Sequence, residues 1–138
     1  MLKKINHIGI AVSSLEQQLP FYRDILKLEF EGFEEVSYQK VKVAIFKIGE
    51  VRIELLQPIS DDSPIAKFIE KKGEGMHHIA YQTDNIENQI HLFQQHDIQM
   101  IDEKPRDGAQ QTRIAFVHPK STGRVLTEIC ESKGDSDE

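Results

Sequence analysis

The chain has 138 residues and a mass of 15.9 kDa, with 38% apolar and 29% charged residues. This composition excludes a disordered protein and predicts one globular domain, or two closely fused half-size modules. The 17 basic and 23 acidic residues give a net charge of −6, which excludes long-range attraction to nucleic acid or to an anionic membrane.

The apolar runs and the single cysteine exclude further classes of protein and of metal site. No apolar run approaches the roughly 18 residues that a membrane span needs, and the charged start lacks the apolar region of a signal peptide. We therefore expect a cytoplasmic protein. Cys130 has no partner for an internal disulfide and excludes a multi-cysteine zinc site, so any bound metal must be held by histidines and carboxylates.

The first half of the chain indicates a strand, a helix and three further strands. We predict the opening strand at 5–12 and a helix capped by Ser14, with apolar residues at helical spacing. Pro20 falls inside this helix, and a proline in a helix interior costs about 3 kcal/mol, so we expect a kink or a late start. The three strands are predicted at about 28–36, 39–48 and 51–58.

The second half repeats this pattern after a short linker. Ser63 and Pro64 have the cap and first-turn chemistry of a short helix, and Asp84 with Glu87 resembles a capping box that opens a helix to about His96. Strands are predicted at about 76–83, 98–102, 112–118 and 124–131. The organisation is then a first module over 1–62, a linker over 63–74, a second module over 75–131 and a disordered tail over 132–138, together one domain.

The repeat selects four residues with metal-binding side chains. At an offset of 71 residues His7 falls on His78, and after three extra residues in the second half Glu54 falls on Glu128. Strand alternation places Glu54 on the face of Leu56, and it places Glu128 on a face with apolar neighbours, Leu126 and Cys130.

Carboxylates on apolar strand faces need a partner, because an unpaired buried charge is costly. One divalent cation shared by two carboxylates and two imidazoles would remove that cost. Ligands of these types, without thiolate, suit Zn, Co, Ni, Mn or Fe(II), and the residues do not choose among them. We expect one divalent metal ion per chain.

Several strings of residues carry a resemblance to a known family. They are INHIGIAV at 5–12, IELLQP at 53–58, DSPIAKF at 62–68, GMHHIA at 75–80, FVHPKS at 116–121 and VLTE at 125–128. In this order they resemble the methylmalonyl-CoA epimerase family of the glyoxalase, or vicinal-oxygen-chelate, superfamily. The resemblance implies an α+β fold of two tandem βαβββ modules that form a cupped, barrel-like mixed sheet. It also implies metal ligands at His7, Glu54, His78 and Glu128.

The resemblance implies an isomerase that interconverts (R)- and (S)-methylmalonyl-CoA. The α-proton would be removed through a metal-stabilised enolate and returned on the opposite face. Glu128 is the first candidate base. Some epimerases carry a glutamate at the position of Val43. Either the second proton transfer falls to another group such as Glu54 or to a metal-bound water, or the chain acts on a different substrate.

The implied partner is an acyl-CoA substrate. Coenzyme A phosphates need cations, and Arg106, Arg113, Lys120 and Arg124 lie on the second-half hairpin and its approach. With the neighbouring hydroxyls, the expected substrate-binding residues are Thr112, Arg113, Lys120 and Ser121. Modules of this superfamily commonly pair, so we expect a homodimer.

Three other functions compete with this interpretation. A glyoxalase I-type lactoylglutathione lyase would use almost the same metal set and similar enediolate chemistry. A ring-cleaving dioxygenase would use two histidines and one carboxylate on Fe(II), whereas four protein ligands are predicted here. A non-catalytic small-molecule-binding protein would need an aromatic groove, and the chain has no Trp and three Tyr.

Overall fold

The computed structural model describes residues 1–132, which form two compact units. One unit, called the first-half unit below, is His7–His77. The second-half unit combines Met1–Asn6 with the residues from His78 onward. None of the helices within 1–132 is long and apolar enough to cross a bilayer. The predicted tail at 133–138 lies outside the described residues, and Ser132 is the last residue of a strand.

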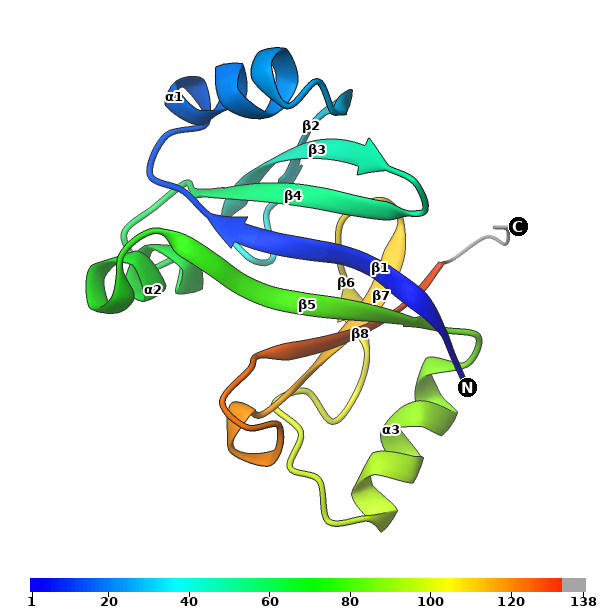
Figure 1. Cartoon of the computed structure of the whole chain (residues 1–138). Coiled ribbons are helices and arrows are strands. Elements are labelled where there is room, and N and C mark those ends of the chain that lie inside the picture. The colour runs from blue at the N-terminus through cyan, green and yellow to red at the C-terminus, as the bar shows by residue number, and fades with distance from the viewer. Residues whose placement is uncertain (133–138) are drawn as a thin grey trace. The chain divides into compact units, whose positions relative to one another are not determined.

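The first-half unit is built on four neighbouring strands (Figure 1). β1 runs parallel to β4, and β4 and β2 each pair antiparallel with β3. A parallel pair requires a crossover, which the first helical segment provides between β1 and the other strands. The bounds are β1 Leu2–Ala11, α1 Leu15–Leu19, β2 Glu29–Val36, β3 Val41–Ile48, β4 Val51–Pro58 and α2 Pro64–Lys72.

Alternation gives this sheet two buried faces. On one face Phe46 and Leu55 are fully buried and pack against Leu15 of α1. The other face carries Glu54 and its apolar neighbours. We call this second face the site face. Its buried apolar residues are Val41, Val43, Ile45 and Leu56.

The helical segment after β1 changes its winding at the proline. Ser14 caps α1 as predicted, with its side chain accepting from the amide of Gln17 at 3.1 Å. The segment does not start late, because α1 begins at Leu15, directly after its cap. A π-helix, η1 (Pro20–Ile25), follows α1, and the amide of Leu26 donates to the carbonyl of Phe21. Because proline has no N–H to close an α-helical turn, the wider turn is the physical response to Pro20.

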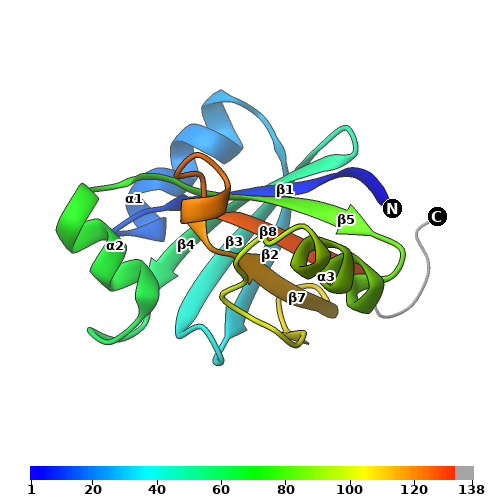
Figure 2. The same ribbon diagram turned by 90° about the horizontal axis from the view of Figure 1, so that it is seen from below.

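The second-half unit repeats the plan with one helix against the sheet. β5 runs parallel to β8, and β7 pairs antiparallel with β8 and with β6. Helix α3 lies against β7 and β8 (Figure 2) and buries Ile86 and Ile90 there. The bounds are β5 Gly75–Thr83, α3 Ile86–Gln95, β6 Arg106–Asp107, β7 Thr112–Val117, the short 3₁₀-helix η2 Pro119–Ser121 and β8 Thr127–Ser132.

The predicted α+β class with a mixed sheet is confirmed. Each half contains parallel and antiparallel pairs, in the order β2-β3-β4-β1 in the first half and β5-β8-β7-β6 in the second. The predicted linker helix is confirmed as α2, with Ser63 accepting from the amide of Ile65.

The strand predicted at 98–102 is wrong. Met100 makes only an isolated bridge to Val117, and the carboxylate of Asp102 accepts from the amide of Phe116 at 2.9 Å. A side chain thus takes the place of the strand carbonyl, and the chain pairs again only at the two-residue β6. The last strand starts at Thr127, later than predicted, because a turn with positive φ at Arg124 precedes it.

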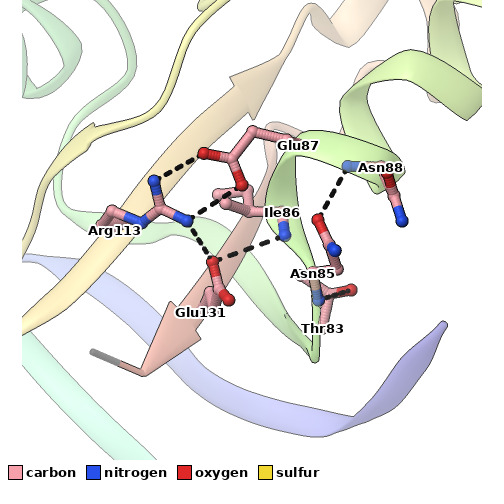
Figure 3. Close-up of polar contacts among 7 residues, drawn as sticks. All are labelled: Thr83, Asn85, Ile86, Glu87, Asn88, Arg113 and Glu131. Atoms are coloured by element: carbon pink, nitrogen blue, oxygen red, sulfur yellow. Dashed lines mark hydrogen bonds and ion pairs between the residues drawn. The ribbon is translucent and has the colours of Figure 1, made fainter. Parts of the chain in front are cut away.

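The helix α3 starts differently from its predicted capping box (Figure 3). Its cap is Asn85, whose side chain accepts from the amide of Asn88 at 3.0 Å, and not Asp84. Glu87 instead accepts two hydrogen bonds from Arg113 of β7, at 2.6 and 3.0 Å. Arg113 also donates to Glu131 of β8 at 2.6 Å. This network ties the first turn of α3 to two strands.

The network fixes the charges of its members. Hydrogen bonding to Arg113 holds the pKa of Glu87 below its ordinary value. Hydrogen bonds to Glu87 and Glu131 raise the pKa of the Arg113 guanidinium. Glu87 and Arg113 are therefore both ionised near neutral pH, and their pairing contributes stability there.

Replacing Arg113 by Met should lower the Tm by about 2–5 °C at neutral pH, because two carboxylates lose their cation. Since the folded pKa of Glu87 is depressed, its contribution is present above the unfolded pKa and is lost as pH falls through the folded pKa. The difference in Tm should therefore shrink below about pH 4. Thermal unfolding from pH 3 to 8 measures this. Arg23→Met, which removes an exposed ion pair with Asp24, is the control. An equal loss of Tm in this variant would contradict a stabilising role of the Arg113 network.

The hairpin between β6 and β7 gives a second stability prediction. Gln110 and Gln111 both have positive φ, at 59° and 55°, a left-handed conformation that favours glycine. Gln111→Gly should raise the free energy of unfolding by roughly 0.5–1 kcal/mol. Glycine removes the strain of the positive φ, and this gain exceeds the cost of the greater freedom of the unfolded chain. Gly108→Ala should do the opposite, because an added Cβ would lie 2.6 Å from a methyl of buried Ile114. Urea unfolding distinguishes these outcomes, and a destabilised Gln111→Gly would contradict the assignment.

Candidate metal centre

The first-half unit places one histidine and one carboxylate together. In the parallel register of β1 and β4, Gly9 is the partner of Glu54, so His7 lies two residues from that pair on the same face. The Nδ1 atom of His7 is 3.5 Å from Oε2 of Glu54. Their side chains are 8% and 5% exposed, so both polar groups are withdrawn from water.

The second-half unit builds an equivalent pair by the same register. In the parallel register of β5 and β8, Ala80 is the partner of Glu128, and His78 lies two residues before Ala80. The Nε2 atom of His78 is 3.0 Å from Oε1 of Glu128, and both side chains are 4% exposed. The ring of Phe116 meets the His78 ring edge-on at 5.5 Å, which supports the imidazole from one side.

Apolar side chains surround the acidic group in the second-half unit. Ala80, Phe116 and Cys130 pack as one buried cluster with Leu126 against it, and Phe116 and Ala80 are the strand partners of Glu128. Cys130 and Leu126 therefore share the face of Glu128, as alternation predicts. A carboxylate in such surroundings needs a cation or strong hydrogen bonds to stay ionised.

Three of the predicted ligands, His7, His78 and Glu128, are buried, and each offers one atom that could bind a metal ion. Their nitrogen and oxygen donors fit a borderline or hard divalent ion, and no thiolate takes part. Glu54 joins this group through its contact with His7. The donor set therefore fits the predicted class of metal.

The residues predicted to bind substrate have structural partners of their own. Arg113 is engaged by Glu87 and Glu131, and the buried Thr112 donates its hydroxyl to the carbonyl of Ala109 at 2.7 Å. The hydroxyl of Ser121 accepts from the amide of Gln99. Lys120 is exposed on η2, where its amide donates to Nδ1 of His118. Contact of these residues with substrate remains a prediction.

Sequence analysis missed a charged pair on the site face. Arg52 is the strand partner of His7, and its Nε donates to Oε1 of Glu31 at 2.9 Å. Alternation alone could have found Arg52, since it lies two residues before Glu54 on the same strand. Glu31 could not be assigned in this way, because an irregularity in β2 shifts the register there.

Comparison with known proteins defines the family. The model of the Glyoxalase/Bleomycin resistance protein/Dioxygenase superfamily matches residues 6–116. Among curated proteins, uncharacterized protein YqjC of Bacillus subtilis is 44% identical over 134 residues, which cover 97% of this chain and 96% of that protein. Human mitochondrial methylmalonyl-CoA epimerase is 36% identical over 129 residues, covering 93% of this chain and 73% of that protein.

Solved structures extend the likeness to the whole fold. A hypothetical protein from Bacillus halodurans matches with a TM-score of 0.94 and 48% identity over 98% of both chains. A variant of Streptomyces coelicolor methylmalonyl-CoA epimerase, in complex with 2-nitronate-propionyl-CoA, matches with a TM-score of 0.95 and 33% identity over 100% of both chains. The fold predicted from the resemblance is thereby confirmed. The chain belongs to the glyoxalase, or vicinal-oxygen-chelate, superfamily and is closely related to the methylmalonyl-CoA epimerases.

Proposed function

We propose that this protein is a divalent-metal-dependent epimerase that interconverts (R)- and (S)-methylmalonyl-CoA. The observation that carries the proposal is the pair of buried histidine–carboxylate contacts, built by the same strand register in each half. The likeness to methylmalonyl-CoA epimerases supports the substrate class, because the S. coelicolor structures contain a coenzyme A thioester. Epimerisation needs a proton to be removed from one face of the α-carbon and returned to the other, and a buried carboxylate in each half would supply the two groups for this.

His7, Glu54, His78 and Glu128 would hold one metal ion, either Zn, Co, Ni or Mn. When bound, the ion supplies Lewis-acid stabilisation of the negative charge that develops on the thioester oxygen. The protein's own part is to keep these four groups dry and aligned. Burial strengthens each electrostatic contact, since the local dielectric is far below that of water.

Glu128 and Glu54 would carry the proton in this proposal. From one enantiomer, the Glu128 carboxylate would take the α-proton, and the electron pair of the broken C–H bond would pass into the thioester to give the enolate. Glu54, protonated at the start of this turnover, would give its proton to the opposite face and end as a carboxylate. The other enantiomer uses the two carboxyl groups in reverse order. Val43 supports the assignment of Glu54, because it is a buried apolar residue paired with Leu56 and offers no acid.

The remaining parts of the proposal concern substrate and assembly. Thr112, Lys120 and Ser121 would line the path of the thioester, with Arg113 holding the strand on which Thr112 lies. We also place the protein in the cytoplasm as a homodimer. Size-exclusion chromatography with light scattering tests the dimer, and a monomer at micromolar concentration would exclude it.

Proton transfer by two bases gives a stereochemical prediction. In D₂O, the wild-type protein should exchange the α-hydrogen of both enantiomers of methylmalonyl-CoA and interconvert them. Glu54→Gln should lose interconversion while it retains exchange from the enantiomer that Glu128 deprotonates, because one base survives. Mass spectrometry and chiral analysis of the recovered acid measure both events.

The exposed variant Glu103→Gln is the matched control, and it should behave as wild type. Absence of exchange in the metal-loaded wild-type protein would contradict the epimerase assignment and favour a glyoxalase-type reaction. Equal loss of exchange from both enantiomers in Glu54→Gln, with metal content unchanged, would contradict the two-base assignment.

Metal binding gives an independent prediction that needs no substrate. Titration of the chelator-treated protein with Co²⁺ should show about one ion per chain, with the absorption spectrum of nitrogen and oxygen ligands. At 100 times the Kd, the ion should stabilise the fold by about 2.7 kcal/mol, measurable by thermal unfolding. His78→Ala and Glu128→Gln should weaken binding at least about 10-fold, whereas Glu103→Gln should not. Unchanged affinity in both ligand variants would rule out this centre.

A further inference from the structure

Arg52 lies in the same row of the sheet as a candidate metal ligand. It is the Cα partner of His7 across the parallel β1–β4 pair, and it lies two residues before Glu54 on β4. Partner residues in neighbouring strands, and residues two apart in one strand, project to the same face. The Arg52 side chain therefore projects from the site face of the first-half unit, on the same strands as His7 and Glu54.

A β-bulge holds this arginine in place. Phe30 and Gly32 of β2 are opposite Phe46 and Ile45, which are consecutive on β3, so Glu31 is an extra residue in β2. The bulge depends on Gly32, whose φ is +114°, a conformation that side chains disfavour. Glu31 accepts from Nε of Arg52 at 2.9 Å, and the two side chains are only 24% and 27% exposed.

The contact with Glu31 leaves most N–H donors of the Arg52 guanidinium available to bind a ligand. A guanidinium has five N–H donors in a planar fork. Within residues 1–132, the Nε bond to Glu31 is the one hydrogen bond formed by this group, so the terminal nitrogens retain their donors. Glu31 thus fixes the orientation of the fork and leaves two adjacent nitrogens that match a carboxylate or a phosphate.

We propose that Arg52, oriented by Glu31, binds an anionic group of the substrate beside the candidate metal centre. This inference rests on the proposed function, because a malonyl thioester of coenzyme A carries a carboxylate on its acyl group and phosphates on its carrier. In a chain of net charge −6, a local cation is needed to bind either group. The carboxylate and the phosphates share this chemistry, and the experiment distinguishes them.

The test compares ligand binding by the Co²⁺-loaded full-length protein and its Arg52→Met variant, measured by calorimetry. Methylmalonyl-CoA, propionyl-CoA, which lacks the malonyl carboxylate, and methylmalonyl-pantetheine, which lacks the phosphates, are the probes. Arg52→Met should weaken methylmalonyl-CoA about 10- to 100-fold. If the acyl carboxylate is bound, propionyl-CoA should be unaffected. If a phosphate is bound, methylmalonyl-pantetheine should be unaffected.

Three further variants separate binding from folding and from general charge. Arg52→Lys keeps the charge but loses the fork, so it should recover only part of the affinity. Glu31→Gln should weaken binding less than Arg52→Met, because it disturbs orientation and leaves the cation. Lys47 is an exposed cation on β3 and is the Cα partner of Arg52 of β4. Lys47→Met should change the affinity less than about 3-fold.

Two outcomes would overturn the inference. One is unchanged affinity of Arg52→Met for methylmalonyl-CoA with normal Co²⁺ binding and normal thermal unfolding. The other is an equal loss in Lys47→Met, which would indicate a diffuse charge effect. The epimerase proposal fails separately, on the absence of α-hydrogen exchange in the wild-type protein, and Arg52-dependent binding could persist in that case.

Discussion

The burial of two carboxylates beside two histidines is the constraint on which this structure depends. Glu54 and Glu128 are 4% and 3% exposed, and each lies among the apolar residues of its strand face. An isolated carboxylate in such a place would protonate or destabilise the fold. The parallel registers of β1 with β4 and of β5 with β8 bring an imidazole to each carboxylate. In the proposed epimerase, a bound cation would offset the cost of burying these carboxylates and would stabilise developing negative charge.

The rest of the fold serves to keep those registers fixed. A parallel pair needs a crossover, and in each half the crossover contains a helix that packs on the face opposite the carboxylate. Phe46 and Leu55 anchor the first half, and Ile86 and Ile129 anchor the second. A slip of one residue would turn His7 or His78 away from the site. The apolar cores on the faces opposite the carboxylates therefore help to specify the geometry of the site.

The duplicated strands and the four candidate ligands could be predicted because alternation and the internal repeat act on the same residues. Features set by single side chains could not. Asp102 replaces a strand carbonyl with its own carboxylate, and Pro20 widens a helical turn to η1. Asn85, one residue after the predicted Asp84, caps α3, while Glu87 pairs with Arg113 of β7 and Asp84 pairs with the N-terminus. Each outcome depends on a tertiary partner that a local pattern does not contain.

The charged groups of the site face lie near Glu54 and not at position 43. Val43 and its partner Leu56 are 1% and 3% exposed, so an added carboxylate there would be buried without a cation of its own. Glu54, in contrast, has His7 at 3.5 Å and lies two residues from Arg52. Glu54 therefore has an imidazole partner and a nearby guanidinium, whereas Val43 and Leu56 present an apolar surface. In the proposed epimerase, acid–base chemistry on this face would fall to Glu54.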